Sequence, residues 1–97
     1  MSKKKRMCIV RTYSAGVFAG ELVSLKGQRA VMRNARRLWY WKGAASLSQL
    51  AMEGVKCPLE CKFPCEVATV ELTQAVEIID MTDAAVASVK GVPIWKQ

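Results

Sequence analysis

The chain contains no histidine. Histidine is the side chain that most often transfers protons in enzymes near neutral pH, so its absence removes most hydrolytic triads and Cys–His pairs. The sequence also has no paired carboxylates suited to acid–base work and no GxxxxGK[ST] phosphate loop. We therefore expect that the protein is not an enzyme, and we predict no catalytic residue and no cofactor.

Long apolar runs are also missing. No stretch approaches the roughly 20 apolar residues that a membrane-spanning helix needs. The basic start of the chain, residues 3–6 (KKKR), is not followed by a long apolar segment, which argues against a secretory signal. We therefore expect a cytoplasmic protein that has no membrane partner.

The cysteines lack the spacing and the partners of a metal site. Cys57, Cys61 and Cys65 lie four residues apart, and Cys8 stands far upstream. Structural zinc sites favour C-x2-C or C-x4-C pairs, often completed by histidine. A cytoplasmic protein keeps its thiols reduced. The sequence therefore predicts free cysteines, with no metal site and no disulfide framework.

Acidic residues are nearly absent from the first half of the chain. Residues 1–49 contain 11 Lys or Arg and a single acid, Glu21, for a charge of +10. Residues 50–97 contain 4 Lys and 7 acids, for a charge of −3, and the whole chain carries +7. Such a field favours anionic partners, but it does not distinguish DNA, RNA, lipid or a small phosphate ligand.

The pattern of residues predicts an α+β fold, a small antiparallel sheet with two short helices. Residues 1–6 are predicted to be a basic tail and residues 7–97 a single ligand-binding domain, because no linker divides the 97 residues. We predict strands over 7–13, 17–25, 29–41 and 67–80. Capping patterns predict helices over 47–53 and between Thr82 and Gly91. A domain this small buries a modest share of its surface, so we expect an oligomer.

Strand alternation in the third predicted strand divides its side chains between two faces. One face carries Val31, Arg33, Ala35, Arg37, Trp39 and Trp41, and the other carries Met32, Asn34, Arg36, Leu38 and Tyr40. The tryptophans either present a ligand-binding surface or face the core beneath the arginine stems. Trp95, near the end of the chain, is expected to pack on the body of the protein or on a partner subunit.

The segment from Asn34 to Gly43 (NARRLWYWKG) concentrates aromatic rings and cations. Aromatic faces beside Arg and Lys are suited to holding a nucleobase by stacking and a phosphate by charge. Residues 46–49 begin a helix directly afterwards, and free amides at a helix start can also hold a phosphate. This segment favours a site for a nucleotide-like anion.

Three function classes are consistent with these observations to different degrees. A small-nucleotide binder is supported by the aromatic and basic segment. An RNA- or DNA-binding protein is supported by the same residues and the basic tail, but the acidic second half and the absence of a recognised motif count against it. An enzyme is opposed by the absence of catalytic groups. Steep salt dependence would favour the polynucleotide class, and stoichiometric uptake of an unaltered nucleotide would favour the first.

Three segments resemble a known family. Residues 11–22 (RTYSAGVFAGEL), 34–51 (NARRLWYWKGAASLSQLA) and 61–64 (CKFP) are similar to the Thoeris anti-defence sponge proteins of phages and prophages, the first-described type. The resemblance implies a protein in the cytoplasm of an infected bacterial host, assembled as homodimers and hexamers. Such proteins sequester cyclic ADP-ribose signals made by TIR proteins, and some also take up CBASS cyclic oligonucleotides, without degrading them.

A site for such a ligand needs a stacking ring, a cation for the pyrophosphate and a close backbone. We expect the adenine to stack on Trp39, Trp41, Tyr13 or Phe18. We expect the pyrophosphate to pair with Arg36, Arg37 or Arg11. The backbone of Ser14, Ala15, Gly16 and Val17 is expected to line the pocket, because Gly16 allows close approach. Tight binding further predicts a recessed pocket that a second subunit closes.

Overall fold

The computed structural model describes residues 5–96. The strands are β1 (Met7–Thr12), β2 (Val17–Lys26), β3 (Arg29–Arg37), β4 (Glu66–Leu72) and β5 (Ala75–Asp80). The helices are α1 (Leu47–Glu53) and α2 (Asp83–Lys90), with a short 3-10 turn, η1, over Pro58–Glu60. The predicted α+β fold with an antiparallel sheet and two short helices is confirmed. Part of the predicted basic tail, residues 1–4, lies outside the described residues.

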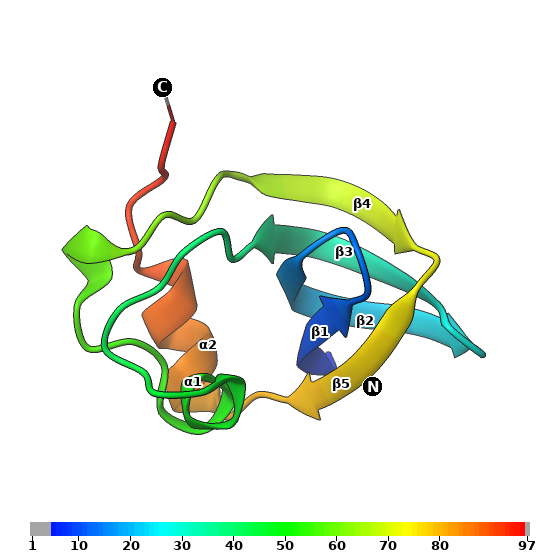
Figure 1. Cartoon of the computed structure of the whole chain (residues 1–97), viewed down its shortest axis with the longest axis horizontal. Coiled ribbons are helices and arrows are strands. Elements are labelled where there is room, and N and C mark those ends of the chain that lie inside the picture. Colours follow the sequence, from blue (N-terminus) through cyan, green and yellow to red (C-terminus); the bar gives the residue numbers. More distant parts are fainter. Residues whose placement is uncertain (1–4, 97) are drawn as a thin grey trace.

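The five strands form one antiparallel sheet in the order β4-β3-β2-β1-β5. Strands β4 and β5 lie at opposite edges of this sheet, yet only Thr73 and Gln74 separate them in the chain. The sheet therefore curls until its two edges approach each other. Figure 1 shows β4 and β5 meeting at this turn, while both helices lie at the other end of the molecule.

The prediction of a single strand over 67–80 is wrong. Both Leu72, which ends β4, and Ala75, which begins β5, are buried in the core, and the polar pair between them belongs to neither strand. The Gln74 carbonyl accepts a hydrogen bond from the Tyr13 amide at 2.9 Å, which holds the turn against the β1–β2 loop. Thr73 and Gln74 are not among the usual turn residues. Because the turn is two residues long, apolar and polar residues continue to alternate across it, and the sequence pattern does not reveal the break.

The predicted third strand ends early, and its predicted faces are wrong. Strand β3 stops at Arg37, and Asn34 has a positive φ of 51° within it. The pairing of β2 with β3 shifts register between Ala19 and Glu21, opposite this position. The irregularity brings Met32 and Ala35 into the same buried cluster, although simple alternation assigns them to opposite faces.

Gly20 makes the close approach at this irregularity possible. An added Cβ at Gly20 would lie 2.7 Å from Ala35 Cα and 3.1 Å from the Asn34 carbonyl oxygen. No other residue type fits there without displacing β3, so the glycine inside β2 and the left-handed Asn34 together shape the sheet.

Two apolar clusters lie on the two faces of the curled sheet. Neighbouring residues of β1 show this division, because Ile9 belongs to one cluster and Cys8 and Val10 to the other. The cluster that contains Cys8 and Val10, which we call the inner cluster, consists of strand residues only. The cluster that contains Ile9, which we call the outer cluster, joins the sheet to α1, α2 and the loop around Phe63. Within residues 5–96, no helix has the length and apolar character that crossing a membrane requires.

Candidate functional site

The loop between β1 and β2 is held rigidly by Thr12. Its hydroxyl donates to the Gly16 carbonyl at 2.7 Å and accepts from the Ala15 amide at 2.9 Å, while its own amide donates to the Gly16 carbonyl at 3.0 Å. Ser14 Oγ adds a bond of 2.6 Å to Gln74 Oε1. Gly16 has a φ of 95°, a conformation that favours glycine. The sequence interpretation passed over Thr12, although a threonine before a Ser/Gly turn is a known signal for such hydrogen bonds.

The segment after β3 runs past this loop in an extended form. The Leu38 amide donates to the Val17 carbonyl at 2.8 Å, which ties the segment to the start of β2. Beyond it, the Lys62 carbonyl accepts from the amides of Trp39 at 3.1 Å and Tyr40 at 3.3 Å, and the Lys62 amide donates to the Tyr40 carbonyl at 2.7 Å. The segment is thus fixed on both sides by backbone hydrogen bonds.

These two segments enclose a groove of about 530 Å³, which we call the aromatic groove. Its lining consists of Ser14, Ala15, Gly16, Val17, Arg37, Leu38, Trp39 and Trp41. Its volume falls within the range of about 300–1,000 Å³ that is usual for small-molecule sites. Most residues of the predicted site therefore meet here, and Leu38 is an additional one that the sequence analysis did not select.

Four residues of the predicted site lie outside the groove lining. Arg11 forms an exposed ion pair with Glu77, with 3.0 Å between Arg11 Nε and Glu77 Oε1. Tyr13 projects into solvent with 80% of its surface exposed. Phe18 is buried in the inner cluster, and Arg36 is buried on the opposite side of β3. For Arg36 the sequence could not make this distinction, because the adjacent Arg37 is the same residue type.

Arg36 has a structural role. Its guanidinium donates to four backbone carbonyls: Pro64 at 2.8 Å, Val89 at 2.8 Å, Phe63 at 2.9 Å and Pro93 at 3.0 Å. Burial lowers the pKa of Arg36 from its usual value, because loss of solvent disfavours the charged guanidinium more than the nearby Glu66 carboxylate favours it. With its donors committed in this way, Arg36 is left out of the proposed site.

Arg37 is exposed and lies over the ring of Phe18, with 4.6 Å between Cζ and the ring centroid. Among residues 5–96, the ion pairs are Arg6–Asp80, Arg11–Glu77, Arg29–Glu71 and Lys42–Glu60, so Arg37 has no carboxylate partner. The groove lining contains no acidic residue either. Arg37 therefore offers an uncompensated charge at the edge of the groove.

The four ion pairs also show how the folded protein partly balances the unequal charges of the two halves of the sequence. Each of them joins a cation from the first half of the chain to an acid from the second half. Folding thus brings the acidic half against the basic half and weakens the field of several exposed arginines. The aromatic groove is a place where a cation is left without such a partner.

The two tryptophans of the groove differ in exposure. Trp41 is half-buried and packs against the outer cluster. Trp39 keeps 64% of its surface exposed and stacks in parallel with Trp95, with 6.4 Å between ring centroids and 3° between ring planes. Trp95 therefore packs on the body of the protein, one of the two outcomes expected from the sequence. Trp39 therefore does not face the core, which was one of the two alternatives that the sequence left open.

The start of α1 does not contribute to the groove. Ser46 Oγ accepts from the Gln49 amide at 3.2 Å, and Gln49 Oε1 accepts from the Ala45 amide at 2.8 Å. The predicted capping box is thus present, displaced by one residue on the returning bond. These amides are satisfied by the chain itself, and none of these residues lines the groove.

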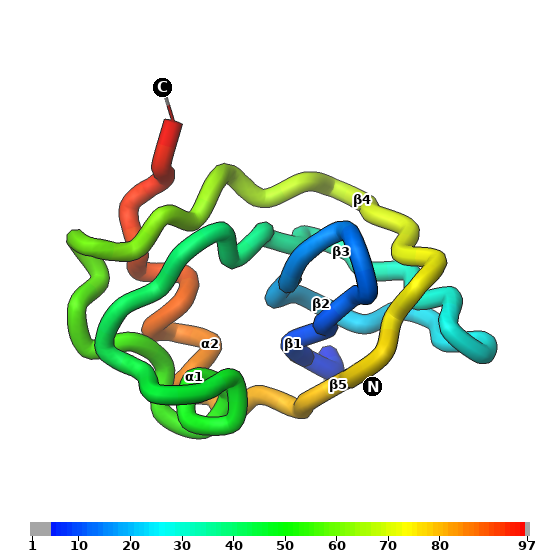
Figure 2. Tube along the Cα trace, in the orientation of Figure 1, coloured from blue at the N-terminus to red at the C-terminus, as the bar shows by residue number. Residues whose placement is uncertain are grey.

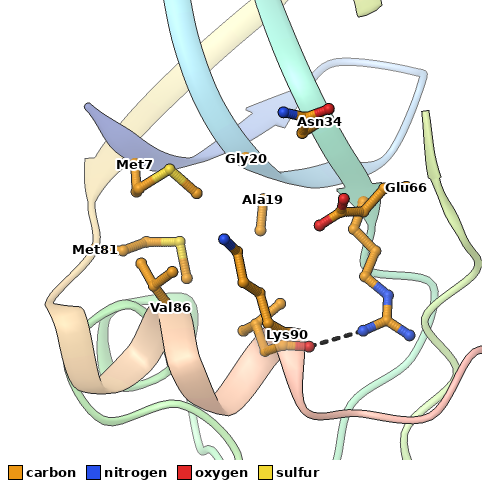
Figure 3. A pocket seen from close by; sticks show the side chains of 10 residues that line it. Met7, Ala19, Gly20, Asn34, Glu66, Met81, Val86 and Lys90 are labelled. Atoms are coloured by element: carbon orange, nitrogen blue, oxygen red, sulfur yellow. Dashed lines mark hydrogen bonds between the residues drawn. The ribbon is translucent and has the colours of Figure 1, made fainter. Parts of the chain in front are cut away.

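A second hollow lies between the sheet and α2 and is far smaller, about 10 Å³. Figure 3 shows Met7, Met81 and Val86 on one side of it and Asn34 and Glu66 on the other, with Lys90 between them. The dashed line in Figure 3 is the bond from Arg36 to the Val89 carbonyl. This volume holds about one water molecule, so the hollow is too small for a nucleotide.

The four cysteines are free thiols in this structure. Cys8 is fully buried, and burial together with its hydrogen bond to Asp80 raises its pKa to about 12. Cys65 is exposed at the other extreme. Over the part of the chain that the structure describes, no three His, Cys, Asp or Glu side chains are grouped as metal ligands.

Fold and site together define a small α+β domain with an aromatic, cationic groove beside a glycine turn. The chain belongs to the family described as Domain of unknown function (DUF6948), whose model matches residues 5–89. No curated protein and no solved structure matches the chain significantly. The function is therefore argued from the groove.

Proposed function

We propose that the aromatic groove binds a small cyclic nucleotide, of the cyclic ADP-ribose class, and sequesters it without chemical change. The observation that carries this proposal is the meeting of Trp39, Trp41 and the unpaired Arg37 around one groove. The exposed face of Trp39 accepts an adenine by stacking, a contact that is worth about 1–3 kcal/mol. Arg37 pairs with the pyrophosphate, and the Ser14–Gly16 backbone approaches the ligand closely.

Sequestration, rather than catalysis, fits the side chains of the groove. Its lining offers a hydroxyl, a guanidinium and two indoles, and it includes no carboxylate or thiol. A serine without a neighbouring base is a weak nucleophile, and a guanidinium stays protonated. These groups can hold an anion and shield it, which is what a protein that competes for a signalling nucleotide must do.

We propose further that two copies of the chain close the groove, within a dimer or a hexamer. Competition with an effector at sub-micromolar signal needs about −9 to −12 kcal/mol of binding free energy. Trp39 is largely exposed to solvent, so one stacked ring and one cation in this groove supply only part of that binding free energy. A second subunit across the opening excludes water and adds contacts. Light scattering on a size-exclusion column checks this: we expect a dimer or larger, and a monomer at micromolar concentration contradicts it.

Native mass spectrometry of the protein with a panel of cyclic nucleotides tests the binding. We expect stoichiometric uptake of cyclic ADP-ribose, with the ligand recovered at its original mass. The matched variants are Arg37→Ala, which removes the groove cation, and Arg33→Ala, which removes an exposed cation outside the groove lining. We expect loss of uptake in the first variant only. A new product mass would restore the enzyme hypothesis. Equal effects of the two variants would exclude the aromatic groove as the binding site.

The alternative is an RNA- or DNA-binding protein. The ion pairs between the two halves of the chain count against it, because they neutralise cations that a polynucleotide would need. Filter binding to single-stranded RNA over a range of salt concentrations separates the two functions. Binding that weakens steeply with salt and is undiminished by cyclic ADP-ribose would favour the alternative.

A further inference from the structure

The C-terminal segment of the chain is joined to the groove through the loop that precedes β4. Phe63 and Ile94 form a parallel bridge, and the Trp95 amide donates to the Phe63 carbonyl at 2.9 Å. The preceding residue, Lys62, forms an antiparallel bridge with Tyr40 on its other side. Three segments that are distant in the sequence thus lie side by side. Figure 2 shows the C-terminal segment, in red, passing this loop.

This arrangement places Trp95 on Trp39. The two indoles are parallel to within 3°, and Trp95 does not itself line the aromatic groove. Trp95 is half-buried, and the Lys62 ammonium lies 5.7 Å from its ring centroid. The exposed ring of Trp39 therefore has a second ring stacked against it, and that ring is itself fixed by a backbone hydrogen bond and a cation.

We infer that Trp95 is a positioning residue for the groove: it holds the plane of Trp39 so that a ligand base can stack on the side that Trp95 leaves open. The inference rests on the proposed nucleotide binding. An indole with 64% of its surface exposed would otherwise turn about two side-chain torsions and would have to be ordered on binding. Ordering the ring beforehand removes that cost from the binding free energy. The stack in the complex is then Trp95, Trp39 and the base.

The experiment compares three substitutions at Trp95 with a neighbouring control. Trp95→Ala removes the stacked ring, Trp95→Leu keeps apolar cover without a ring, and Trp95→Phe keeps a ring. Ile94→Ala is the matched control, because Ile94 is exposed in the same segment but lies outside the aromatic stack. Calorimetric titration with cyclic ADP-ribose gives the affinity, and far-ultraviolet circular dichroism reports the coupling between the two indoles.

We expect Trp95→Ala and Trp95→Leu to weaken binding by about fivefold to tenfold, consistent with the worth of one aromatic pair. Trp95→Phe should restore most of the affinity, and Ile94→Ala should leave it unchanged. The indole coupling signal should disappear in all three Trp95 variants and persist in the control. A role in folding alone would not produce rescue by phenylalanine and failure with leucine.

The outcomes separate this inference from the proposal beneath it. If the unsubstituted protein binds cyclic ADP-ribose and Trp95→Leu binds it equally well, the positioning role of Trp95 is overturned, and the proposal that the groove binds the nucleotide is retained. If the unsubstituted protein binds none of the nucleotides in the panel, the proposed function fails and the inference fails with it. If all variants lose binding together with their thermal transition, the leucine variant included, Trp95 is a folding residue and the inference is overturned.

Discussion

The guanidinium of Arg37 lies over the ring of Phe18, 4.6 Å from its centroid, at the border of the aromatic groove. The ring supports the charge from below and leaves its hydrogen-bond donors free for a ligand. The preceding residue, Arg36, points to the other side of β3, where its guanidinium donates hydrogen bonds to four backbone carbonyls. Two adjacent arginines thus have different surroundings, and substitutions at each should have separate effects.

Arg37→Ala should weaken uptake of cyclic ADP-ribose by about 10- to 100-fold, because a hydrogen bond to a charged group contributes about 1.5–3 kcal/mol. It should change the free energy of unfolding by less than about 1 kcal/mol, because Arg37 is itself exposed and a cation–π contact of an exposed cation contributes little. Calorimetry and urea denaturation measure the two effects. Equal losses in binding and stability would remove Arg37 from the proposed site.

Arg36→Ala should lower the free energy of unfolding by about 3 kcal/mol or more. The substitution leaves four carbonyls, from Phe63, Pro64, Val89 and Pro93, without their donor in a buried region. Arg36→Lys should rescue little, because one ammonium cannot reproduce a planar set of donors. The measurement is the urea transition, and a midpoint equal to that of the unsubstituted protein would contradict this role.

The contrast between these arginines shows what the sequence could and could not indicate. The aromatic and basic segment identified one wall of the groove, and the Ser-Ala-Gly turn identified the other, because both depend on local composition. Which arginine lines the aromatic groove depends on carbonyls from residues 63–93, far along the chain, that bind the other one. No local pattern carries that information.

The same distinction between local and long-range information applies to the fold. Capping residues predicted α1 with its observed bounds, because Ser46 and Gln49 act within one turn. The turn between β4 and β5 was missed because polar Thr73 and Gln74 continue the alternation. The positive φ of Asn34 was missed because it accompanies a close approach to Gly20, which lies on a neighbouring strand. Long-range pairing decides such positions, and alternation within a strand cannot reveal it.

Gly20→Ala should destabilise the fold by about 1–3 kcal/mol, because overpacking a tight site forces the backbone to move. The added methyl would meet Ala35 Cα at 2.7 Å, and that atom belongs to the backbone. Gly27→Ala is a suitable control, since no atom lies within 4 Å of the methyl it adds. The control should cost only the backbone strain of its positive φ, about 1 kcal/mol. Thermal denaturation compares the two, and a larger loss for the control would refute the close approach.

Asp80→Asn should reduce stability at neutral pH, with the difference shrinking in acid. Arg6 donates to Asp80 Oδ1 at 2.9 Å and Cys8 at 3.2 Å, and these bonds lower the pKa of Asp80 below its usual 3.8. A carboxylate whose folded pKa is depressed adds stability above its unfolded pKa and loses it as the pH falls through the folded value. The difference between the two proteins should therefore be full above pH 3.8 and fade below it.

Urea denaturation at a series of pH values measures this difference. Arg6→Ala is the matched variant, because it removes the main partner of Asp80 and keeps the carboxylate. It should lose part of the same acid-sensitive stability. A gap between Asp80→Asn and the unsubstituted protein that stays constant from neutral pH into strong acid would show that the loss does not come from this carboxylate.

The thiols should react with a disulfide reagent in the order of their exposure. Cys65 is exposed and should be modified first, followed by the half-buried Cys57. Cys8 should resist modification at neutral pH for two reasons: no part of it reaches solvent, and burial raises its pKa to about 12, so almost no thiolate is present. Cys65→Ser should abolish the fast phase of labelling. Addition of urea should expose Cys8 and restore its reaction, so native-state labelling of Cys8 as rapid as that of Cys65 would show that the β1 strand is not packed as described.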